Sequence, residues 1–181
     1  MIVHLTIAGT DDIPIDETSD LYRNLVTSLQ VSGDPQLPIR VALRKVKLLI
    51  LSAAIAILPD YDWDSVEPKL RAALLARFGF NARELGQPAF LSEAVAAIQA
   101  IEGVDYVEMK VFASVSQDIS AEDLASLAST LRLNPHVTAF TARRNPAAVA
   151  GDDPAMRLLP AELAFMTPEI PDTVILTRLG A

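Results

Sequence analysis

The densest group of side chains that could do chemistry is Asp60-Tyr61-Asp62-Trp63-Asp64, where carboxylates alternate with aromatic rings. Alternate carboxylates occur in calcium-binding loops, which also need glycine at the sixth position and glutamate at the twelfth. Counted from Asp60, those positions hold Ser65 and Arg71. The group is more typical of a helix start, where a carboxylate accepts hydrogen bonds from free backbone amides. We predict no metal site and no cofactor here.

Other reactive groups are sparse and poorly spaced. The two histidines, His4 and His136, are far apart, and neither has a neighbour at the spacing of metal ligands. The chain has no cysteine, which excludes disulfides and thiolate nucleophiles. It has no G-x-S-x-G motif and no glycine-rich phosphate loop. The sequence therefore predicts no catalytic residue, and we expect the chain not to be an enzyme.

A second interpretation uses scattered carboxylates such as Asp60, Glu67 and Glu84. A small acidic ligand-binding domain or a carboxylate-based enzyme would need a concave pocket that holds such a carboxylate with a strongly shifted pKa. That requirement distinguishes it from an assembly protein, which would instead expose apolar surface. Arg83, Glu84 and Gln87 form a polar loop, for which we expect solvent exposure or local capping.

The composition narrows the choice of partners. The chain has 181 residues with 23 acids and 15 bases, and its net charge is −8. Such a surface repels a phosphate backbone unless the bases gather on one face. The two basic groups, Arg40-Arg44-Lys45-Lys47 and Arg143-Arg144, are small, and lysines at strand edges commonly block unwanted pairing. We predict no nucleic-acid partner.

The hydropathy pattern argues against a membrane segment. The longest uncharged apolar run is Leu48 to Leu58, whereas a membrane helix needs about 20 residues. This run predicts a buried strand, covered on both sides or central in its sheet. Met1 leads straight into alternating residues rather than a signal peptide, so we expect synthesis in the cytoplasm.

The periodicities predict alternating strands and helices. Strands are expected at residues 1–8, 39–43, 46–58, 104–113 and 136–141. Helices are expected from about Ser19 to Val31, from Asp62 or Asp64 (or only from Pro68) to Phe78, from a cap at Ser92, and from a cap at Ser120 that is paired with Asp123. The last helix should bury Leu124, Leu127, Ala128 and Leu131. Gly33, Gly79 and Gly103 follow helical patterns and should end the helices, and at Gly33 and Gly103 we expect the left-handed conformation that glycine favours.

This order predicts an α+β fold: a split βαβ-like sandwich with helices packed on a mixed or antiparallel sheet, plus an extended C-terminal tail. We divide the chain into a core domain at 1–142, a linker-like segment at 143–157, and an apolar tail at 158–181. Pro160, Pro168 and Pro171 interrupt the tail, and Thr173 to Leu179 is typical of a strand.

Two roles are open for the apolar tail. It either covers the sheet of its own domain or adds a strand to the edge of a neighbouring subunit. On the second hypothesis, removing everything after Asp153 should leave the domain folded and abolish association. The tail side chains and the aromatic pair at the helix entrance are our candidate partner contacts: Trp63, Tyr61, Phe165, Ile175, Leu176 and Leu179.

Many short segments, in order along nearly the whole chain, resemble the C-terminal part of baseplate J-like proteins. They are Val3–Ala8, Asp20–Leu25, Pro59–Trp63, Val66–Pro68, Arg71–Leu75, Arg83–Pro88, Leu91–Glu93, Ile98–Ile101, Gly103–Val107, Leu159–Ala164 and Ile170–Leu176. The resemblance implies a structural baseplate wedge or assembly component of a contractile phage tail or related contractile injection system. It implies protein–protein contacts with other wedge and hub proteins and, as a further expectation, with copies of itself. It implies no catalytic residue, and it places the assembled chain in a tail particle.

Overall fold

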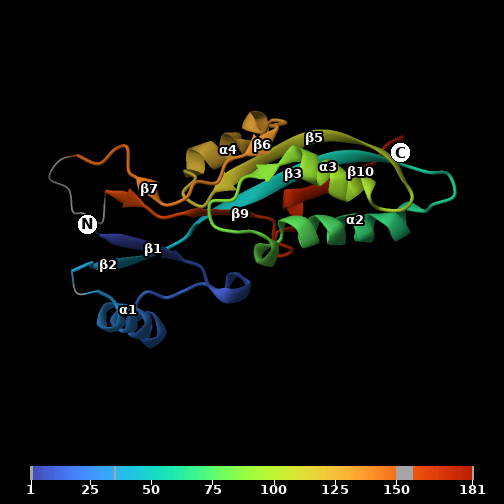
Figure 1. The fold of residues 1–181 in the computed structure, drawn as a ribbon. Coiled ribbons are helices and arrows are strands. Elements are labelled where there is room, and N and C mark those ends of the chain that lie inside the picture. The colour runs from blue at the N-terminus through green and yellow to red at the C-terminus, as the bar shows by residue number, and fades with distance from the viewer. Residues whose placement is uncertain (1, 35, 150–156, 181) are drawn as a thin grey trace.

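The computed structural model describes residues 2–34, 36–149 and 157–180 (Figure 1). Within its fourth helix, the side chains of five residues are outside the description: Ala121, Leu124, Ala125, Ala128 and Thr130. The predicted burial of Leu124 and Ala128 therefore lies outside the described residues. So does the part of the predicted linker at 150–156.

The α+β class predicted from the sequence is confirmed, and the longer elements follow in the predicted order. The helices are α1 (Asp20–Ser32), α2 (Trp63–Phe78), α3 (Leu91–Gln99) and α4 (Ala121–Thr130), with short 3-10 turns η1 (Thr10–Asp12), η2 (Phe80–Ala82) and η3 (Pro171–Thr173). The strands are β1 (Val3–Ile7), β2 (Ile39–Leu43), β3 (Lys45–Ile57), β4 (Ala89–Phe90), β5 (Val104–Ser116), β6 (His136–Val137), β7 (Arg143–Arg144), β8 (Leu158–Leu159), β9 (Glu162–Phe165) and β10 (Val174–Arg178).

The long apolar strand β3 is the centre of the main sheet. It pairs along its length with antiparallel β5, from Lys47 opposite Ser116 to Ile57 opposite Val104. On its other edge it pairs with two parallel strands in turn, β9 and then β10. Because β3 has neighbours on both edges, its apolar composition fits the predicted central position.

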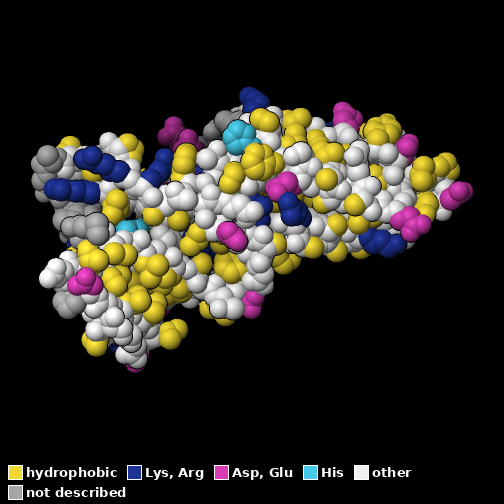
Figure 2. All heavy atoms as spheres, viewed as in Figure 1, with side chains coloured by type: hydrophobic (Ala, Val, Ile, Leu, Met, Phe, Trp, Pro, Cys, Tyr) yellow, Lys and Arg dark blue, Asp and Glu magenta, His cyan; other side chains and the backbone are white. Residues whose placement is uncertain are grey.

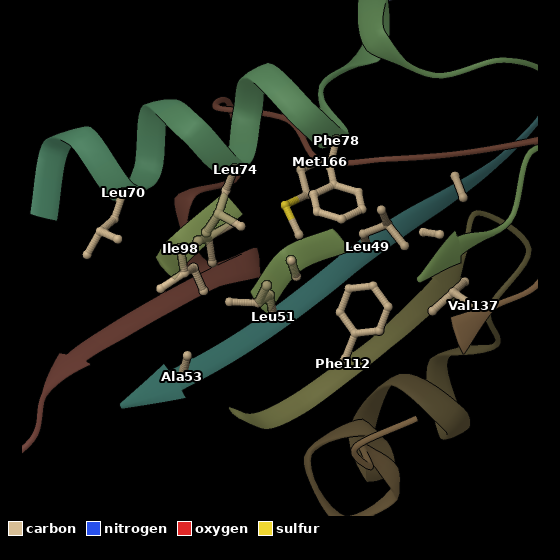
Figure 3. Close-up of a cluster of buried hydrophobic side chains, with 14 of the residues drawn as sticks. Leu49, Leu51, Ala53, Leu70, Leu74, Phe78, Ile98, Phe112, Val137 and Met166 are labelled. Carbon is tan, nitrogen blue, oxygen red and sulfur yellow. The ribbon is translucent and has the colours of Figure 1, made fainter. Parts of the chain in front are cut away.

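Helices α2 and α3 cover one face of this sheet and form the core with it (Figure 3). Leu70, Leu74 and Phe78 project from α2 toward the sheet. They meet Leu49 and Leu51 of β3, and all five side chains are fully buried. Burying one such side chain contributes roughly 1.5–3 kcal/mol to the free energy of unfolding, so this layer contributes strongly to the stability of the domain.

Several helix ends agree with the predictions. Ser19 precedes α1, and its Oγ accepts a hydrogen bond from the Tyr22 amide at 3.2 Å. Ser120 precedes α4 and accepts from the Asp123 amide at 3.0 Å, as predicted. Each cap satisfies an amide that the first helical turn leaves free.

Other helix ends differ from the predictions. Helix α2 begins at Trp63 and contains Pro68 in its interior, and its N-cap Asp62 makes no side-chain capping bond. Helix α3 begins one residue before Ser92, and there the Glu93 carboxylate accepts from the Phe90 amide. Asp62, one of the two predicted caps, therefore takes the N-cap position of α2 without a side-chain bond, whereas α3 starts upstream of its predicted cap Ser92.

Of the three glycines that follow predicted helices, Gly103 alone is left-handed, as expected, with φ of 97°. Gly33 and Gly79 are extended, with φ of −83° and −66°. A helix can therefore end directly into an extended chain, without the left-handed residue that glycine favours.

The C-terminal segment is built into the main sheet. Val174 to Arg178 pair with Leu51 to Ile55, and Glu162 to Phe165 pair with Lys45 to Leu48. Ala164, Met166 and Val174 belong to the buried core. Of the two roles that we considered for the tail, these residues therefore have the first: they pack on the sheet of their own domain.

The N-terminal unit, defined here as residues 2–43 with β1, η1, α1 and β2, forms a separate layer (Figure 1). Its two strands are parallel and directly adjacent, with Val3 opposite Ile39 and Ile7 opposite Leu43. The chain then continues through Arg44 into β3. No other strand in the described part of the chain joins this two-stranded sheet.

Candidate interaction surfaces

The aromatic pair at the entrance of α2 packs on its own domain. Tyr61 and Trp63 are partly buried and lie against the core cluster. The Tyr61 hydroxyl donates to Glu102 Oε1 at 2.8 Å, and this hydrogen bond raises the pKa of Tyr61. The pair therefore packs over the start of α2 on its own domain.

The candidate contacts in the C-terminal segment lie in different environments. Phe165 is buried, with its ring edge-on to Phe80 at 5.4 Å between centroids. Leu176 packs partly on the core, and the Leu179 amide donates to Ile55 O at 2.8 Å. Ile175 is 48% exposed on the opposite sheet face. Of the six predicted contacts, Ile175 alone presents a largely open apolar side chain.

Apolar side chains gather on the surface of the N-terminal unit (Figure 2). Not one of its described residues is fully buried. Val3, Leu5, Ile39 and Val41 share one sheet face, and the end of α1 packs on it, where Gly33 approaches the Ile39 side chain. The large apolar residues of the unit that remain exposed are Val3, Leu5, Ile13, Leu21, Leu25 and Val31.

This surface was missed by sequence reasoning. Leu21 and Leu25 were expected on the buried face of a helix, but they are 79% and 38% exposed. The periodicity identified the apolar side of α1 correctly. What it could not show is that the sheet beneath α1 has two strands, too few to cover that side.

The N-terminal unit is joined to the main domain by a polar contact between η1 and η2. Arg44 is ion-paired with Asp12, and its guanidinium lies over the Phe80 ring, 5.4 Å from the centroid. The side-chain amide Nδ2 of Asn81 donates to Asp11 Oδ1 at 2.7 Å. Burial lowers the pKa of Arg44. Asp11 and Asp12 both have positive φ, at 50° and 61°, so this junction holds backbone strain.

Several of the basic side chains noted in the sequence are held by local contacts. Lys45 pairs with Asp118 at 2.5 Å, and Lys47 pairs with Glu162 at 2.9 Å. The Arg143 guanidinium lies 3.6 Å from the centroid of the Phe140 ring. These cations therefore serve contacts within the domain.

The carboxylates of the alternative interpretation are not brought together. Asp60 precedes α2, Glu67 is in its second turn, and Glu84 follows its far end. Glu67 is ion-paired with Arg71 at 2.8 Å. A helix of 16 residues spans about 24 Å, which separates Glu84 from the other two. No group of three metal-ligating side chains occurs among the described residues.

The polar loop at 83–88 contains a buried cation that we had expected in solvent. Arg83 is 7% exposed, and its Nη2 donates to Pro88 O at 2.6 Å and to Gln87 O at 3.2 Å. Its Nη1 lies 3.5 Å from Glu93 Oε2. Burial lowers the pKa of Arg83. Arg83 therefore shapes its own loop, which corresponds to the local capping that we had also considered.

The comparisons with known proteins point to the N-terminal unit. Residues 1–42 match the family described as the Baseplate J-like central domain. No curated protein matches the chain. No helix in the described ranges has the length and apolar character needed to cross a membrane. Over these residues the chain is similar to baseplate J-like proteins, and the match supports a structural role in a phage baseplate.

Proposed function

We propose that this chain is a wedge or assembly component of a baseplate in a contractile phage tail or related contractile injection system. It acts through protein–protein contacts with wedge and hub neighbours. The observation that carries the proposal is the coincidence of two features. The family match covers residues 1–42, and the N-terminal unit at the same residues has an open apolar side. A unit that cannot bury its own apolar side is suited to assembly.

The proposal assigns the rest of the chain to the C-terminal part of a baseplate J-like protein. The sequence resemblance in residues 59–107 and 159–176 supports this placement. These segments build α2, α3, β9 and β10, which pack together around β3. The main domain then acts as a rigid support that presents the N-terminal unit to its neighbours.

Partner contacts are proposed for two regions. The first is the exposed apolar side of α1 and β1, represented by Leu21 and Leu5. The second is the sheet face around Ile175, where Leu179 is also partly open. Phe165 and Leu176 are better assigned to the packing of the domain itself, because both contact buried residues.

The proposal is tested by locating the chain in particles. An affinity-tagged chain is expressed in cells that make the tails, the particles are purified on a gradient, and gold label on the tag is imaged. We expect label at the baseplate end. Particles without the chain, or label along the shaft, would contradict a baseplate role.

A matched pair of variants tests the contact surface in the same assay. Leu21→Glu changes a side chain that is 79% exposed on α1, and Ile170→Glu changes one that is 47% exposed on the main domain. Neither should unfold the chain, because both side chains already face solvent. We expect Leu21→Glu to be lost from particles and Ile170→Glu to be retained. Equal incorporation would show that the apolar side of α1 is not a contact.

A further inference from the structure

A polar hollow lies beside the main sheet, where the end of α4 and strand β6 meet β3 and β5 (Figure 1). Its volume is about 340 Å³, which is at the lower end of the range for small-ligand pockets. Each of its polar side chains brings at least one hydrogen-bond donor, and none of them is a carboxylate. They are Lys47, Ser114, Arg132, Asn134, His136 and Thr138.

Most of these donors have no acceptor within the described part of the chain. The hydroxyls of Ser114 and Thr138 and the ring of His136 make no hydrogen bond there. Arg132 uses its Nη1, which donates to two carbonyls at the end of α4 at 2.6 and 2.9 Å. These two bonds fix the guanidinium and leave its Nε and Nη2 without an acceptor among the described residues. Unpaired donors that share one hollow are suited to a ligand group that only accepts.

Asn134 holds the segment between α4 and β6 in this position. Its backbone amide donates to Phe112 O at 3.1 Å, and its Nδ2 donates to the same carbonyl at 3.0 Å. Nδ2 also donates to Arg132 O at 3.3 Å. The segment is therefore fixed against β5, and Arg132 and His136, two residues to either side of Asn134, both line the hollow.

The charge of the hollow differs from that of the protein as a whole. The chain has a net charge of −8, yet no acid lines the hollow. The charge of Lys47 is matched by Glu162, 2.9 Å away. Arg132 has no ion pair in the described structure, so its charge is in excess here. An anion is therefore attracted to this hollow and repelled by much of the remaining surface.

We propose that the hollow binds the oxyanion group of a small ligand, a phosphate or a carboxylate. Arg132 donates to it through Nε and Nη2, because a guanidinium favours two parallel bonds to an oxyanion. The hydroxyls of Ser114, from β5, and Thr138, directly after β6, add further donors. The inference goes beyond the baseplate role and does not depend on it, because binding is measured with the purified chain alone.

A nuclear magnetic resonance titration of the isotope-labelled chain tests the site. Inorganic phosphate and acetate are the probes, sodium chloride is the reference, and pH and ionic strength are held constant. We expect saturable shifts of the Ser114, Asn134 and Thr138 amides with at least one probe, and the probe that binds more tightly identifies the group. Shifts no larger than those in sodium chloride would overturn the proposal.

A matched pair of arginine variants assigns the binding to the hollow. Arg132→Gln should weaken it about tenfold or more, since hydrogen bonds to a charged donor are lost. Arg178→Gln makes the same charge change on β10, on the far side of β3 from β5, and should keep the affinity of the parent chain. If both variants bind the probe equally well, the proposal is wrong.

A matched pair of serine variants covers the case in which Arg132→Gln disturbs the end of α4. Ser114→Ala leaves that helix and the charge unchanged and should weaken binding roughly two- to tenfold, through the loss of one neutral hydrogen bond. Ser52→Ala is its control. Ser114 lies opposite Leu49, whereas Ser52 points to the other face of the sheet, since residues of a strand alternate. Equal affinities of Ser114→Ala and Ser52→Ala would refute the site.

Discussion

The ring of Tyr61 lies against Gly103 so closely that a Cβ atom built on this glycine would stand 2.5 Å from Tyr61 Cδ1. Gly103 has φ of 97°, and its carbonyl accepts from the Leu58 amide at 2.9 Å. The contact joins the end of β3 to the turn between α3 and β5. Both the backbone angle and the available space therefore favour glycine here.

We expect Gly103→Ala to lower the free energy of unfolding by at least about 1 kcal/mol, from positive-φ strain together with the clash. Gly180→Ala is the matched control, because Gly180 has φ of 84° and nothing within 4 Å of its added Cβ. Denaturant unfolding of both variants separates the cost of positive φ, which both share, from the cost of the clash with Tyr61, which only Gly103→Ala has. Tyr61→Ala combined with Gly103→Ala should recover the part that is due to the clash. Equal losses for the two glycine variants would mean that Tyr61 adds nothing.

Removing everything after Asp153 should destabilise the main domain severely. The deletion removes β9 and β10 and so leaves one whole edge of β3 unpaired. It also removes Ala164, Met166 and Val174 from the buried core. We expect the truncated chain to lose cooperative thermal unfolding by circular dichroism and to aggregate in light scattering. A truncated chain that melts cooperatively would instead support a separable tail.

Local signals explain the part of the fold that could be predicted. The caps Ser19 and Ser120 act within three residues, so the sequence alone indicated both helix starts. The apolar run at 48–58 indicated a central strand because burial of both faces leaves no polar alternation. The wrong prediction at Gly33 is local too, since a helix can continue directly into extended backbone, as it also does at Gly79.

Long-range pairing explains what could not be predicted. The sequence of Val174–Arg178 does not indicate that this strand pairs with Leu51–Ile55, more than a hundred residues earlier. Likewise, the pattern of Leu21 and Leu25 shows an apolar helix side but not the extent of the sheet beneath it. The open apolar surface of the N-terminal unit could not be predicted for this reason, because its exposure depends on how many strands that unit contains.

The stability of the N-terminal unit should fall as the pH drops below about 6.5. Burial and the adjacent Arg40 guanidinium lower the pKa of His4 in the folded chain. The unfolded chain, with an ordinary histidine pKa of about 6.5, therefore binds a proton that the folded chain does not. Stability is then lost from pH 6.5 down to the lowered pKa of His4, and it is unaffected by this group at higher pH.

Thermal unfolding between pH 5 and 8 checks this prediction. His4→Gln should flatten the pH dependence in that range, while His136→Gln, which removes a histidine from β6, should preserve it. A parent chain and a His4→Gln variant with the same pH profile would contradict the role assigned to His4.

The last prediction concerns the junction between the N-terminal unit and the main domain. The Arg44 side chain is 10% exposed and that of its partner Asp12 is 33% exposed, and Arg44 Nε has no hydrogen-bond partner in the described structure. Asp12→Asn removes the counter-charge but keeps a residue type that tolerates positive φ. We expect it to cost about 1–3 kcal/mol, because a largely buried cation loses its charged partner. Asp20→Asn is the control, because it removes the acid of an exposed ion pair, the one between Asp20 and Arg23. It should cost about 0.5 kcal/mol or less.

Hydrogen exchange should then show faster opening of β1 and α1 in Asp12→Asn, while β3 and β5 keep their protection. Similar stabilities for the two variants would mean that the apolar contacts around Phe80, rather than the ion pair, hold the unit in place.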